Sequence, residues 1–296
     1  MDINALQAFT AVAEKGSFSR AAESLFVTQP AVSKRIALLE QALGTRLFDR
    51  IGHGVSLTQA GERLLPRARD LLSKLDDMAR EIGNLSGEVS GSLSMGTSHH
   101  IGLHRLPPVL RHYSAAFPEV DLDIRFMDSE QACNEVARGT LELGIVTLPR
   151  TPADELEILP LWKDRLHVVA GRDHPLAAIA HPKLSRLVKY GAVLPSASTF
   201  TRGRLQEALG DYADKLHVTM STNYMETLKM LAVIGLGWTV LPATMLDEKL
   251  ARVDVSGLHI SRDLGIVTHR QRTLSNAARA MIEACRAEAG ADRPAA

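Results

Sequence analysis

The chain has 296 residues, of which 45% are apolar, and its 34 basic side chains balance 34 acidic ones, so its formal net charge is zero. The apolar content excludes a mainly disordered chain, and the charge balance excludes a uniformly basic coat for nucleic acid. The N-terminus lacks a secretory signal, no run of about 18 apolar residues predicts a membrane span, and two cysteines cannot form a disulfide framework. We therefore expect a soluble, cytoplasmic, multidomain protein with no membrane partner.

Residues 1–58 are the first predicted domain, with three short helices followed by a β-hairpin. Apolar residues recur at helical spacing: Leu6, Phe9, Val12 and Ala13 in the first helix, Ala21, Ala22, Leu25 and Phe26 in the second, and Val32, Ile36, Leu39 and Leu43 on the inner face of the third. Gly16 favours the end of the first helix, Thr28 is a plausible N-cap of the third, and Pro30 fits that helix's first turn. Two glycines between short β-prone pieces predict the hairpin.

These elements in this order are typical of a winged helix-turn-helix, whose third helix enters the major groove while the hairpin follows the DNA backbone. An amide side chain can read adenine, a basic one can meet guanine or phosphate, and a hydroxyl can contact either. The candidate contacts are Gln29, Ser33, Lys34 and Arg35 on the third helix, and Arg50 and His53 in the wing. The alternative is a small helical bundle with a solvated polar face. Residues 1–60 hold six basic and five acidic side chains, so local charge does not decide between them.

Residues 59–89 are predicted to form one long linker helix. Its apolar residues recur in alternating steps of four and three, a heptad pattern over about three heptads, and this seam consists of Leu64, Ala68, Leu71, Leu75, Met78, Ile82 and Leu85. So narrow a stripe favours a partner helix from a second copy, with dimer contacts at Leu64, Leu71, Leu75, Met78 and Ile82. The alternative is an amphipathic helix that packs against its own domain.

Residues 90–296 alternate strands with helices, an α/β pattern whose length suits two lobes. The expected strands lie at residues 92–95, 120–126, 143–146, 166–170, 192–194, 217–220, 237–241 and 264–267. We assign residues 91–162 and 267–296 to the first lobe and residues 163–266 to the second. The expected fold class is therefore α/β and multidomain.

Two runs of the N-terminal sequence carry a resemblance to a known family. The first extends from Leu6-Gln7-Ala8-Phe9 through Gly16-Ser17-Phe18-Ser19-Arg20-Ala21-Ala22 and Thr28-Gln29-Pro30-Ala31-Val32-Ser33 to Leu47-Phe48-Asp49-Arg50, and the second is Leu57-Thr58-Gln59-Ala60-Gly61-Glu62. Over these residues the chain resembles the LysR-type transcriptional regulators. The resemblance implies a winged helix-turn-helix, a dimerising linker helix and a two-lobed effector domain like that of periplasmic binding proteins.

The same resemblance implies partners and further site residues. The motif adds to the DNA contacts Ser17, Ser19, Arg20, Thr28, Pro30 and Ala31. The implied partners are double-stranded promoter DNA, a small-molecule effector and further copies of the chain in a homodimer or a dimer of dimers, with RNA polymerase as another candidate. In one departure from the family, Ile36-Ala37 follow the basic pair where many relatives carry a polar residue, which leaves base specificity open.

Ligands of two-lobed α/β domains bind in the cleft at the carboxyl ends of strands, near helix N-termini. The loops expected there are rich in hydroxyl groups, and the candidate effector residues are Thr97, Ser98, His99, Ser129, Thr147, Ser196, Ser198, Thr199, Thr201 and Asn223. Arg202 and Arg204 follow closely and few aromatic residues adjoin the loops, so a small polar or anionic effector is favoured over a large flat one. The alternative for each Ser or Thr is ordinary helix N-capping.

His100 and His104 stand four residues apart, which would place them on one face of a helix. We expect no metal site there, because two prolines downstream obscure the helical register and no nearby carboxylate or cysteine completes a ligand set. Cys133 and Cys285 are expected to be buried small hydrophobes rather than a redox switch.

The sequence contains no motif for catalysis, so we expect neither an enzyme nor a cofactor. Gly235-Leu236-Gly237 precedes a strand, whereas a phosphate-binding loop follows one. The rival interpretation is a small-molecule binding protein or enzyme whose N-terminal helices only mediate oligomerisation, and Arg50 in the wing argues against it. The sequence therefore predicts a sequence-specific DNA-binding transcriptional regulator that responds to a small effector.

Overall fold

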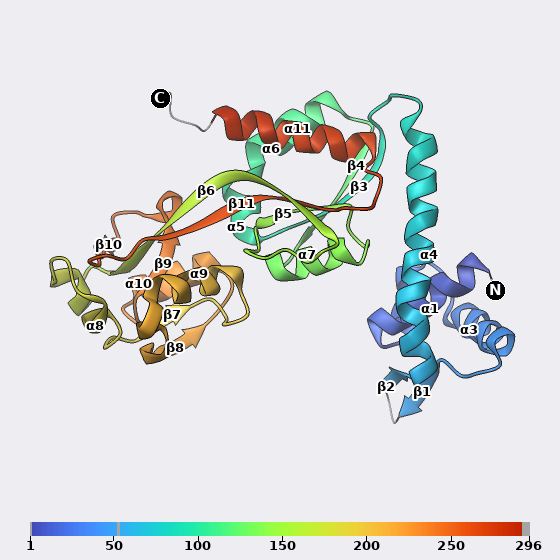
Figure 1. Cartoon of the computed structure of the whole chain (residues 1–296), viewed down its shortest axis with the longest axis horizontal. Helices are drawn as coiled ribbons and strands as arrows, with labels where there is room; N and C mark the ends of the chain where they lie inside the picture. The colour runs from blue at the N-terminus through green and yellow to red at the C-terminus, as the bar shows by residue number, and fades with distance from the viewer. Residues whose placement is uncertain (1, 52–53, 292–296) are drawn as a thin grey trace. The chain divides into compact units, whose positions relative to one another are not determined.

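The computed structural model describes residues 2–51 and 54–291 of the chain. Contacts divide the chain into two compact units, Met1–Ser86 and Gly87–Ala296. The first unit contains helices α1 to α4 and a β-hairpin, and the second contains the remaining strands and helices (Figure 1). None of the helices in the described residues combines the length and the apolar composition that crossing a membrane requires.

The first unit is built from three short helices, a hairpin and a long helix. Their bounds are α1 Ile3–Lys15, α2 Phe18–Ser24, α3 Gln29–Leu43, β1 Phe48–Ile51, β2 Gly54–Leu57 and α4 Gln59–Asn84. The Asp2 carboxylate caps α1 by accepting the Ala5 N–H at 2.8 Å, and the Ser17 hydroxyl caps α2. Gly16 and Gly44 end α1 and α3 at φ angles of 60° and 66°, a left-handed conformation that favours glycine.

Helices α1, α2 and α3 pack around a shared apolar core. Phe9 and Val32 are fully buried in it, and the ring of Phe9 lies 5.3 Å from that of Phe48 at the start of the hairpin. Aromatic contacts of this kind extend the core from the helices onto β1. The inner face of α3 is therefore held by packing along its length, at Val32, Ile36 and Leu39.

Two residues predicted to be apolar parts of these helices are placed differently. Helix α2 ends at Ser24, and Phe26 lies in the following turn at a φ of 52° with its side chain 97% exposed. The Phe26 N–H donates to the Glu23 carbonyl, so the tight turn directs the ring away from the core. Leu43 is also exposed, because it stands in the last turn of α3. The prediction that Leu43 points inward is wrong.

The hairpin is fixed to the helices at both ends. Glu40 Oε1 accepts the Leu47 N–H at 2.7 Å, which holds the entry into β1. At the exit, the Thr58 hydroxyl donates to the Arg46 carbonyl at 2.8 Å and accepts the Gly61 N–H at 3.1 Å. A Cβ on Gly61 would lie 2.3 Å from the Leu47 carbonyl oxygen, so the start of α4 can approach the hairpin this closely only with glycine at that position.

The second unit is organised around a seven-stranded sheet in the order β10-β6-β11-β5-β3-β4, with β9 also paired to β6. Its strands are β3 Gly91–Thr97, β4 Val120–Phe126, β5 Leu143–Thr147, β6 Leu156–Gly171, β9 Thr239–Pro242, β10 Leu250–Arg252 and β11 Ile260–His269. Strand β3 pairs in parallel with β4 and β5, whereas β11 pairs antiparallel with β5 and β6. A smaller parallel sheet joins β7 Ala192–Leu194 to β8 Val218–Ser221.

Strands β6 and β11 run through both lobes of this unit (Figure 1). They are longer than the sequence predicted, because each continues past the apolar runs at residues 166–170 and 264–267. Charged residues such as Asp164 and Arg262 interrupt the apolar pattern of these strands and conceal their full length. The two lobes are therefore joined by continuous β-structure.

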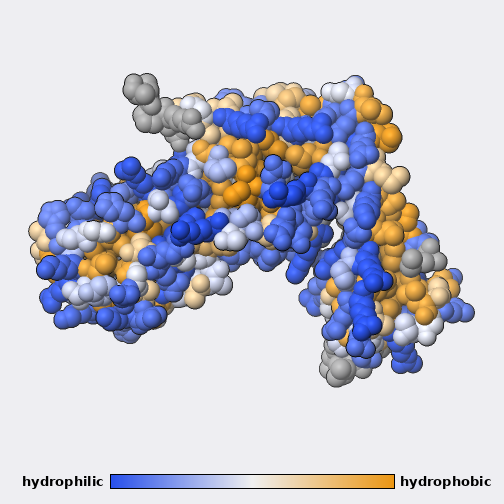
Figure 2. Space-filling view, viewed as in Figure 1, coloured by the Kyte–Doolittle hydropathy of each residue, from blue (hydrophilic) through white to orange (hydrophobic). Residues whose placement is uncertain are grey.

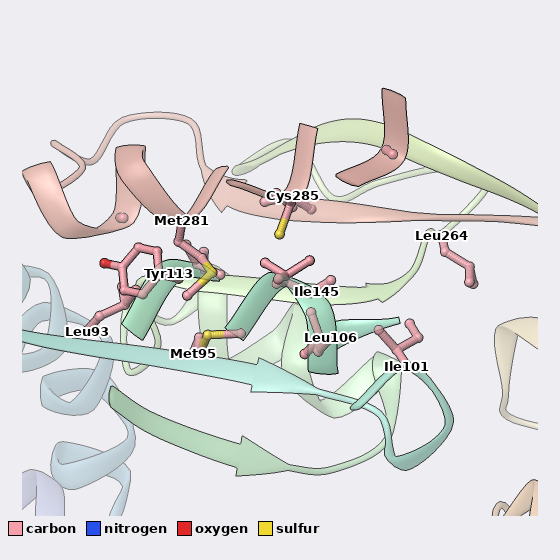
Figure 3. Packing of buried hydrophobic residues seen from close by; sticks show 14 of the residues in the cluster. Leu93, Met95, Ile101, Leu106, Tyr113, Ile145, Leu264, Met281 and Cys285 are labelled. Atoms are coloured by element: carbon pink, nitrogen blue, oxygen red, sulfur yellow. The ribbon is translucent and has the colours of Figure 1, made fainter. Parts of the chain in front are cut away.

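Lobe I is a three-layer arrangement around β3, β4 and β5. Helices α6 Leu106–Ala116 and α11 Asn276–Ala291 lie on one face of the sheet, and α7 Ser129–Ala137 lies on the other (Figure 1). Figure 3 shows Tyr113 of α6 and Met281 of α11 packed over the strands, and the Tyr113 hydroxyl donates to the Ala277 carbonyl at 2.9 Å. The short helix α5, His99–His104, follows β3 directly.

Lobe II contains the smaller sheet and the strand ends of β6, β9 and β10. Its helices are α8 Leu184–Leu187, α9 Phe200–Leu209 and α10 Met225–Val233, with short 3-10 helices at Pro175–Ala178, Gly210–Lys215 and Ala243–Met245. Trp238 is fully buried at its centre and donates its indole N–H to the Tyr190 carbonyl at 3.2 Å. This satisfies the one polar atom of the largest buried side chain.

Candidate functional site

Helix α3 presents a polar outer face in the first unit. Lys34 is exposed, and Ser33 and Arg35 beside it are half-buried. The exposed side chain of Gln29 donates an Nε2 hydrogen bond to the Ser33 hydroxyl at 2.9 Å. Because the opposite face of α3 is buried in the core, these polar groups stand on a firmly held helix.

The other predicted DNA contacts lie around this face. The Ser17 hydroxyl accepts the Arg20 N–H at 3.4 Å, so it already caps α2. The remaining positions at the starts of α2 and α3 are exposed, except for one half-buried alanine, and they are Ser19, Arg20, Thr28, Pro30 and Ala31. Arg50 pairs with Val55 across the hairpin, but its side chain lies outside what the structure describes, as does all of His53.

One basic residue of this surface, Arg46, was not predicted from the sequence. Arg46 is exposed directly before the hairpin and lines, together with Ser33 and Asp49, a groove of about 510 Å³ between α3 and β1. Its position between the end of α3 and the wing is the signal that could have marked it as a candidate phosphate contact.

Helix α4 divides into two halves with different surroundings. In the first half Ala68 is buried, Leu64 and Leu65 pack partly against the core of α1 to α3, and Arg69 pairs with Glu14 of α1 at 3.0 Å. From Leu71 onward Leu75 is half-buried and the other seam residues are exposed, by 43% at Leu71, 62% at Met78, 71% at Ile82 and, just past the end of the helix, 81% at Leu85. Figure 2 shows hydrophobic surface along this part of the helix. Packing against its own domain thus accounts for the first half of α4 only.

A cavity of about 50 Å³ lies between the two lobes of the second unit. Its walls come from the ends of β3 and β5, the starts of α7, α9 and α10, and the first part of β11. They are formed by Ser98, His99, His100, Asp128, Ser129, Glu130, Thr147, Pro195, Thr199, Thr201, Asn223, Tyr224, Met225 and Arg262. Several helix N-termini and strand ends therefore converge on one small polar space.

Arg262 is the cation of this cavity and is almost completely buried. It lies opposite Asp164 in the β6–β11 pairing, and the Asp164 carboxylate accepts from its Nε at 2.9 Å and its Nη2 at 2.8 Å. Its Nη1 donates to the Thr201 hydroxyl at 2.8 Å. Burial lowers the pKa of Arg262, while Asp164 acts in the opposite direction and favours the charged form.

Two carboxylates face the same cavity and bridge the lobes. The Asp128 carboxylate accepts from Asn223 Nδ2 at 2.6 Å. The Glu130 carboxylate accepts the N–H of Phe200, the first residue of α9. Burial raises the pKa of Glu130, and the hydrogen bond from Phe200 opposes that rise. The cavity therefore has mixed charge, which the sequence did not indicate.

Aromatic rings flank the cavity at His99. The imidazole ring lies 5.2 Å from the ring of Phe126 and 4.8 Å from that of Tyr224, and both of these side chains are about half exposed. The prediction that few stacking faces adjoin the effector loops is wrong, because Phe126 and Tyr224 come from elements that the sequence did not bring together. A flat group can therefore contact aromatic surface at this edge of the cavity.

Two family models match this chain. One, described as "Bacterial regulatory helix-turn-helix protein, lysR family", matches residues 3–62, and the other, described as "LysR substrate binding domain", matches residues 86–290, which is more than half of the chain.

The chain belongs to the LysR family.

Known relatives and solved structures agree with this LysR assignment. The HTH-type transcriptional regulator BbuR of Bordetella bronchiseptica is 32% identical over 251 residues, which cover 85% of this chain and 77% of BbuR. The HTH-type transcriptional activator CmpR of Synechocystis is 28% identical over 286 residues, 95% of this chain and 93% of CmpR. A crystal structure of full-length CbnR complexed with its target DNA shares the fold, with a TM-score of 0.63 at 22% identity over 97% of this chain and 100% of that one.

The chain is thus a LysR-type, DNA-binding transcriptional regulator with a domain of the substrate-binding kind. The family, the fold class and the regulatory function that the sequence predicted are confirmed. Its relatives are regulators rather than enzymes, so the rival interpretation of an enzyme receives no support from them.

The predicted effector residues of this LysR-type protein divide into two groups. Those that line the cavity are Ser98, His99, Ser129, Thr147, Thr199, Thr201 and Asn223. Thr97, Ser196 and Ser198 lie outside the lining. The Thr97 hydroxyl is fully buried and donates to the Ile145 carbonyl at 2.8 Å, the Ser196 N–H donates to Asn223 Oδ1 at 3.0 Å, and Ser198 is exposed. Thr97 and Ser196 therefore hold segments that carry lining residues.

Most of the lining hydroxyls are already engaged. Thr199 caps α9 by accepting the Arg202 N–H at 3.2 Å, as the N-capping alternative predicted. The Ser129 hydroxyl accepts the Thr147 N–H at 3.0 Å. Ser98 stands at the N-cap position of α5 but makes no capping hydrogen bond within the described chain. Ser98 is therefore a lining hydroxyl that is available to a ligand.

The arginines that the sequence offered as anion partners lie outside the cavity lining. Arg202 is buried, and that burial lowers the pKa of its guanidinium. Arg204 reaches Glu207 at 3.7 Å along α9. The rotation of α9 directs both side chains away from the lining, and Arg262, 60 residues further along the sequence, supplies the cation instead. No local pattern could have found it, because it lies in the interior of a strand.

His100 and His104 do share a face of α5, with ring centroids 4.8 Å apart. The sequence argument against a ligand set considered only nearby residues, whereas the fold brings Glu226 of α10 to 3.4 Å from His104 Nε2. Burial, reinforced by Arg262, lowers the pKa of His100 to about 3, so its ring is neutral.

The two cysteines lie in separate apolar clusters on opposite faces of the lobe I sheet. Both are buried, and burial raises the pKa of each thiol to about 12. Figure 3 shows Cys285 within the core of lobe I. Thiols that stay protonated at neutral pH are poor nucleophiles, which agrees with both cysteines acting as small buried apolar side chains.

Proposed function

We propose that this regulator binds double-stranded promoter DNA with the outer face of α3 in the major groove and the hairpin along the backbone. The observation that carries the proposal is the rigidly held polar face of α3, with Gln29, Ser33, Lys34 and Arg35 directed outward. The proposed backbone contacts at the helix starts and the hairpin are Ser17, Ser19, Arg20, Thr28, Pro30, Ala31, Arg46, Arg50 and His53. Promoter DNA lies in the bacterial cytoplasm, which is where this activity would take place.

We propose that two copies of the chain associate through the second half of α4. Water contacts Leu71, Met78 and Ile82 in the single chain, and a partner helix would bury this seam at about 25 cal/mol per Å² of apolar surface. The first half of α4 is already packed on its own domain, so Leu64 contributes less than the sequence predicted. Assembly into a dimer of dimers and contact with RNA polymerase stay predictions from the family resemblance.

We propose that a small polar effector occupies the cavity between the lobes. Arg262 suits an anionic group, the Ser98 and Thr147 hydroxyls suit a hydrogen-bonding group, and the Asp128 and Glu130 carboxylates suit donors. A ligand that carries both an acidic group and hydrogen-bond donors therefore fits better than a purely anionic one.

Effector binding would act by changing how the lobes meet. The cavity of about 50 Å³ is far smaller than the few hundred Å³ that typical ligand sites occupy. An effector must therefore separate the lobes and replace the bridges from Asp128 to Asn223 and from Glu130 to Phe200. A ligand that binds one lobe arrangement more tightly shifts the population toward it.

The proposed DNA-binding function is tested by binding the full chain to the DNA upstream of its own gene. We expect tighter binding than to a scrambled sequence of the same length. We also expect the affinity to fall steeply between 50 and 200 mM salt, because proteins with 6–10 phosphate contacts lose about 10³–10⁵-fold in affinity over this range. Equal binding to both DNAs at all salt concentrations would contradict the proposal.

The proposed effector class is tested by a thermal-shift screen of the full chain against small acids, amino acids and neutral metabolites. A ligand that binds only the folded state raises the melting temperature. We expect the hits among molecules that carry both an acidic group and hydrogen-bond donors. Hits confined to large apolar or flat ligands would contradict this class.

A further inference from the structure

Three side chains with metal-binding chemistry meet where the two lobes face each other. His100 and His104 come from α5 in lobe I, and Glu226 comes from α10 in lobe II. One candidate ligand atom from each of the three lies within 4.8 Å of the other two. Two imidazoles and a carboxylate are a ligand combination that zinc accepts, often with a fourth position left open.

One of the three separations already equals that around a bound ion. Ligand atoms about 2.0–2.1 Å from a tetrahedral zinc stand roughly 3.4 Å from one another. His104 Nε2 and Glu226 Oε1 are already 3.4 Å apart. The i, i+4 spacing on one helical turn brings the His100 ring to the same face, and its candidate ligand atom lies within 4.8 Å of the other two.

His100 supplies a second, independent observation. Its side chain is 95% buried, and its Nδ1 atom has no hydrogen-bond partner among the described residues. A buried polar atom without a partner costs free energy, so such an atom calls for an explanation. A metal ion bound at this atom would give it the partner that it lacks.

We propose that His100, His104 and Glu226 together bind one divalent transition-metal ion, such as Zn²⁺, that links lobe I to lobe II. His100 also lines the cavity, so a coordination position left open by the three protein ligands would face the space proposed for the effector. His104 and Glu226 are partly exposed, which gives the ion a path from solvent. The site goes beyond the proposed effector function, because the three ligands can hold the ion when no effector is present.

The consequence of such an ion is control over the lobe arrangement. His100 and His104 belong to α5 and Glu226 belongs to α10, so opening the lobes would break the bond between the metal and the Glu226 carboxylate. The bound ion would therefore favour the arrangement seen here over an open one. Metal availability would then bias the same movement that the effector is proposed to use.

The test is a titration of the chelator-treated full-length chain with Zn²⁺, followed by calorimetry. We expect one strong equivalent per chain, and a loss of at least about tenfold in affinity for His104→Ala and for Glu226→Gln, because disturbing even a ligand's supporting partner costs about 10–100-fold. Glu226→Gln retains a hydrogen-bonding group opposite His104, so a merely structural role for this pair would leave its Zn²⁺ affinity unchanged.

The matched control is His112→Ala, which removes an exposed histidine of α6 outside the cluster. We expect this variant to bind Zn²⁺ as the wild type does, and Zn²⁺ to raise the melting temperature of both while leaving that of His104→Ala unaffected. Wild-type affinity in both cluster variants, or an equal loss in His112→Ala, would overturn the proposal by assigning the binding to surface histidines. DNA and effector binding are measured on the metal-free chain, so failure here would leave those proposals standing.

Discussion

The two units of this protein hold their functional side chains in opposite ways. In the first, Lys34 is exposed on α3 and Met78 is exposed on α4, so both are free to meet an external partner. In the second, the cavity groups are bonded to one another, as Arg262 is to Asp164 and Glu130 is to the start of α9. The proposed DNA-binding surface would therefore need no rearrangement, whereas the proposed effector site would have to exchange internal bonds for ligand bonds.

This contrast predicts that single substitutions act differently in the two units. Changes on α3 or on the outer half of α4 should weaken association without unfolding the chain. Changes in the cavity should alter stability and ligand binding together.

Arg262→Met should destabilise the second unit strongly. It leaves the Asp164 carboxylate buried without its partner, and breaking a buried ion pair in this way costs about 3–5 kcal/mol. The measurement is chemical denaturation of the full chain, with separate probes for the two units. The double variant Arg262→Met with Asp164→Leu removes both charges and should recover most of the loss. Equal instability in the single and double variants would show that the ion pair is not the cause.

Met78→Asp should break the dimer but leave each chain folded. The side chain is 62% exposed in the single chain, so a charge costs little there, but in the dimer two copies would meet in a dry seam. A penalty of about 3 kcal/mol corresponds to a loss of more than about 100-fold in dimer affinity. Analytical ultracentrifugation measures it. Ala79→Asp places the same charge one residue away, off the seam, and should dimerise normally.

Ser98→Ala and Thr199→Ala should separate ligand binding from helix capping. Both hydroxyls line the cavity, and each should contribute about 0.5–1.5 kcal/mol to binding of an effector identified by thermal shift. Thr199 also caps α9, so its alanine variant should lose about 1 kcal/mol of stability as well. Calorimetry together with thermal melting distinguishes the two variants. Unchanged effector affinity in both would place the ligand elsewhere.

Glu130→Gln should give the smallest effect, and it should depend on pH. Burial raises the folded-state pKa of Glu130, so the folded chain binds this proton more readily than the unfolded chain does. Its contribution to stability is fully present below the unfolded pKa of about 4.3 and is lost as pH rises through the folded pKa. The Glu130→Gln variant should therefore have a higher melting temperature than the wild type at pH 7, and the difference should vanish near pH 4. A difference that grows toward low pH would contradict this sign.

The same contrast explains what the sequence could predict. In the first unit, apolar spacing, caps and glycine ends are local signals, and they located α1, α3 and the hairpin closely. Phe26 is one exception, because a hydrophobic side chain in a tight turn looks like the continuation of a helix, and Leu43 is another, because it stands in the last turn of α3. The exposed seam in the second half of α4 agrees with the sequence pattern, because a strict heptad repeat indicates a partner helix that the single chain lacks.

In the second unit, only part of the cavity could be predicted. Ser98, Thr147 and Thr199 were found because loops at strand ends converge in α/β folds. Arg262 of the cavity and Glu226 beside His104 were missed, because each reaches its partners from an element far along the sequence. The sequence around a charged residue in a strand or a helix does not indicate which distant group that residue will contact.

The most direct test of the central claim compares Arg35→Ala and Ser33→Ala with the wild type in fluorescence-anisotropy titrations. The DNA is the region upstream of the gene, with a scrambled duplex as reference, and circular dichroism verifies the fold of each variant. The account predicts folded proteins that lose about 1–3 kcal/mol of binding to the upstream DNA for each lost base contact, with smaller changes on scrambled DNA. Wild-type affinity and specificity in both variants would show that the outer face of α3 does not read the promoter.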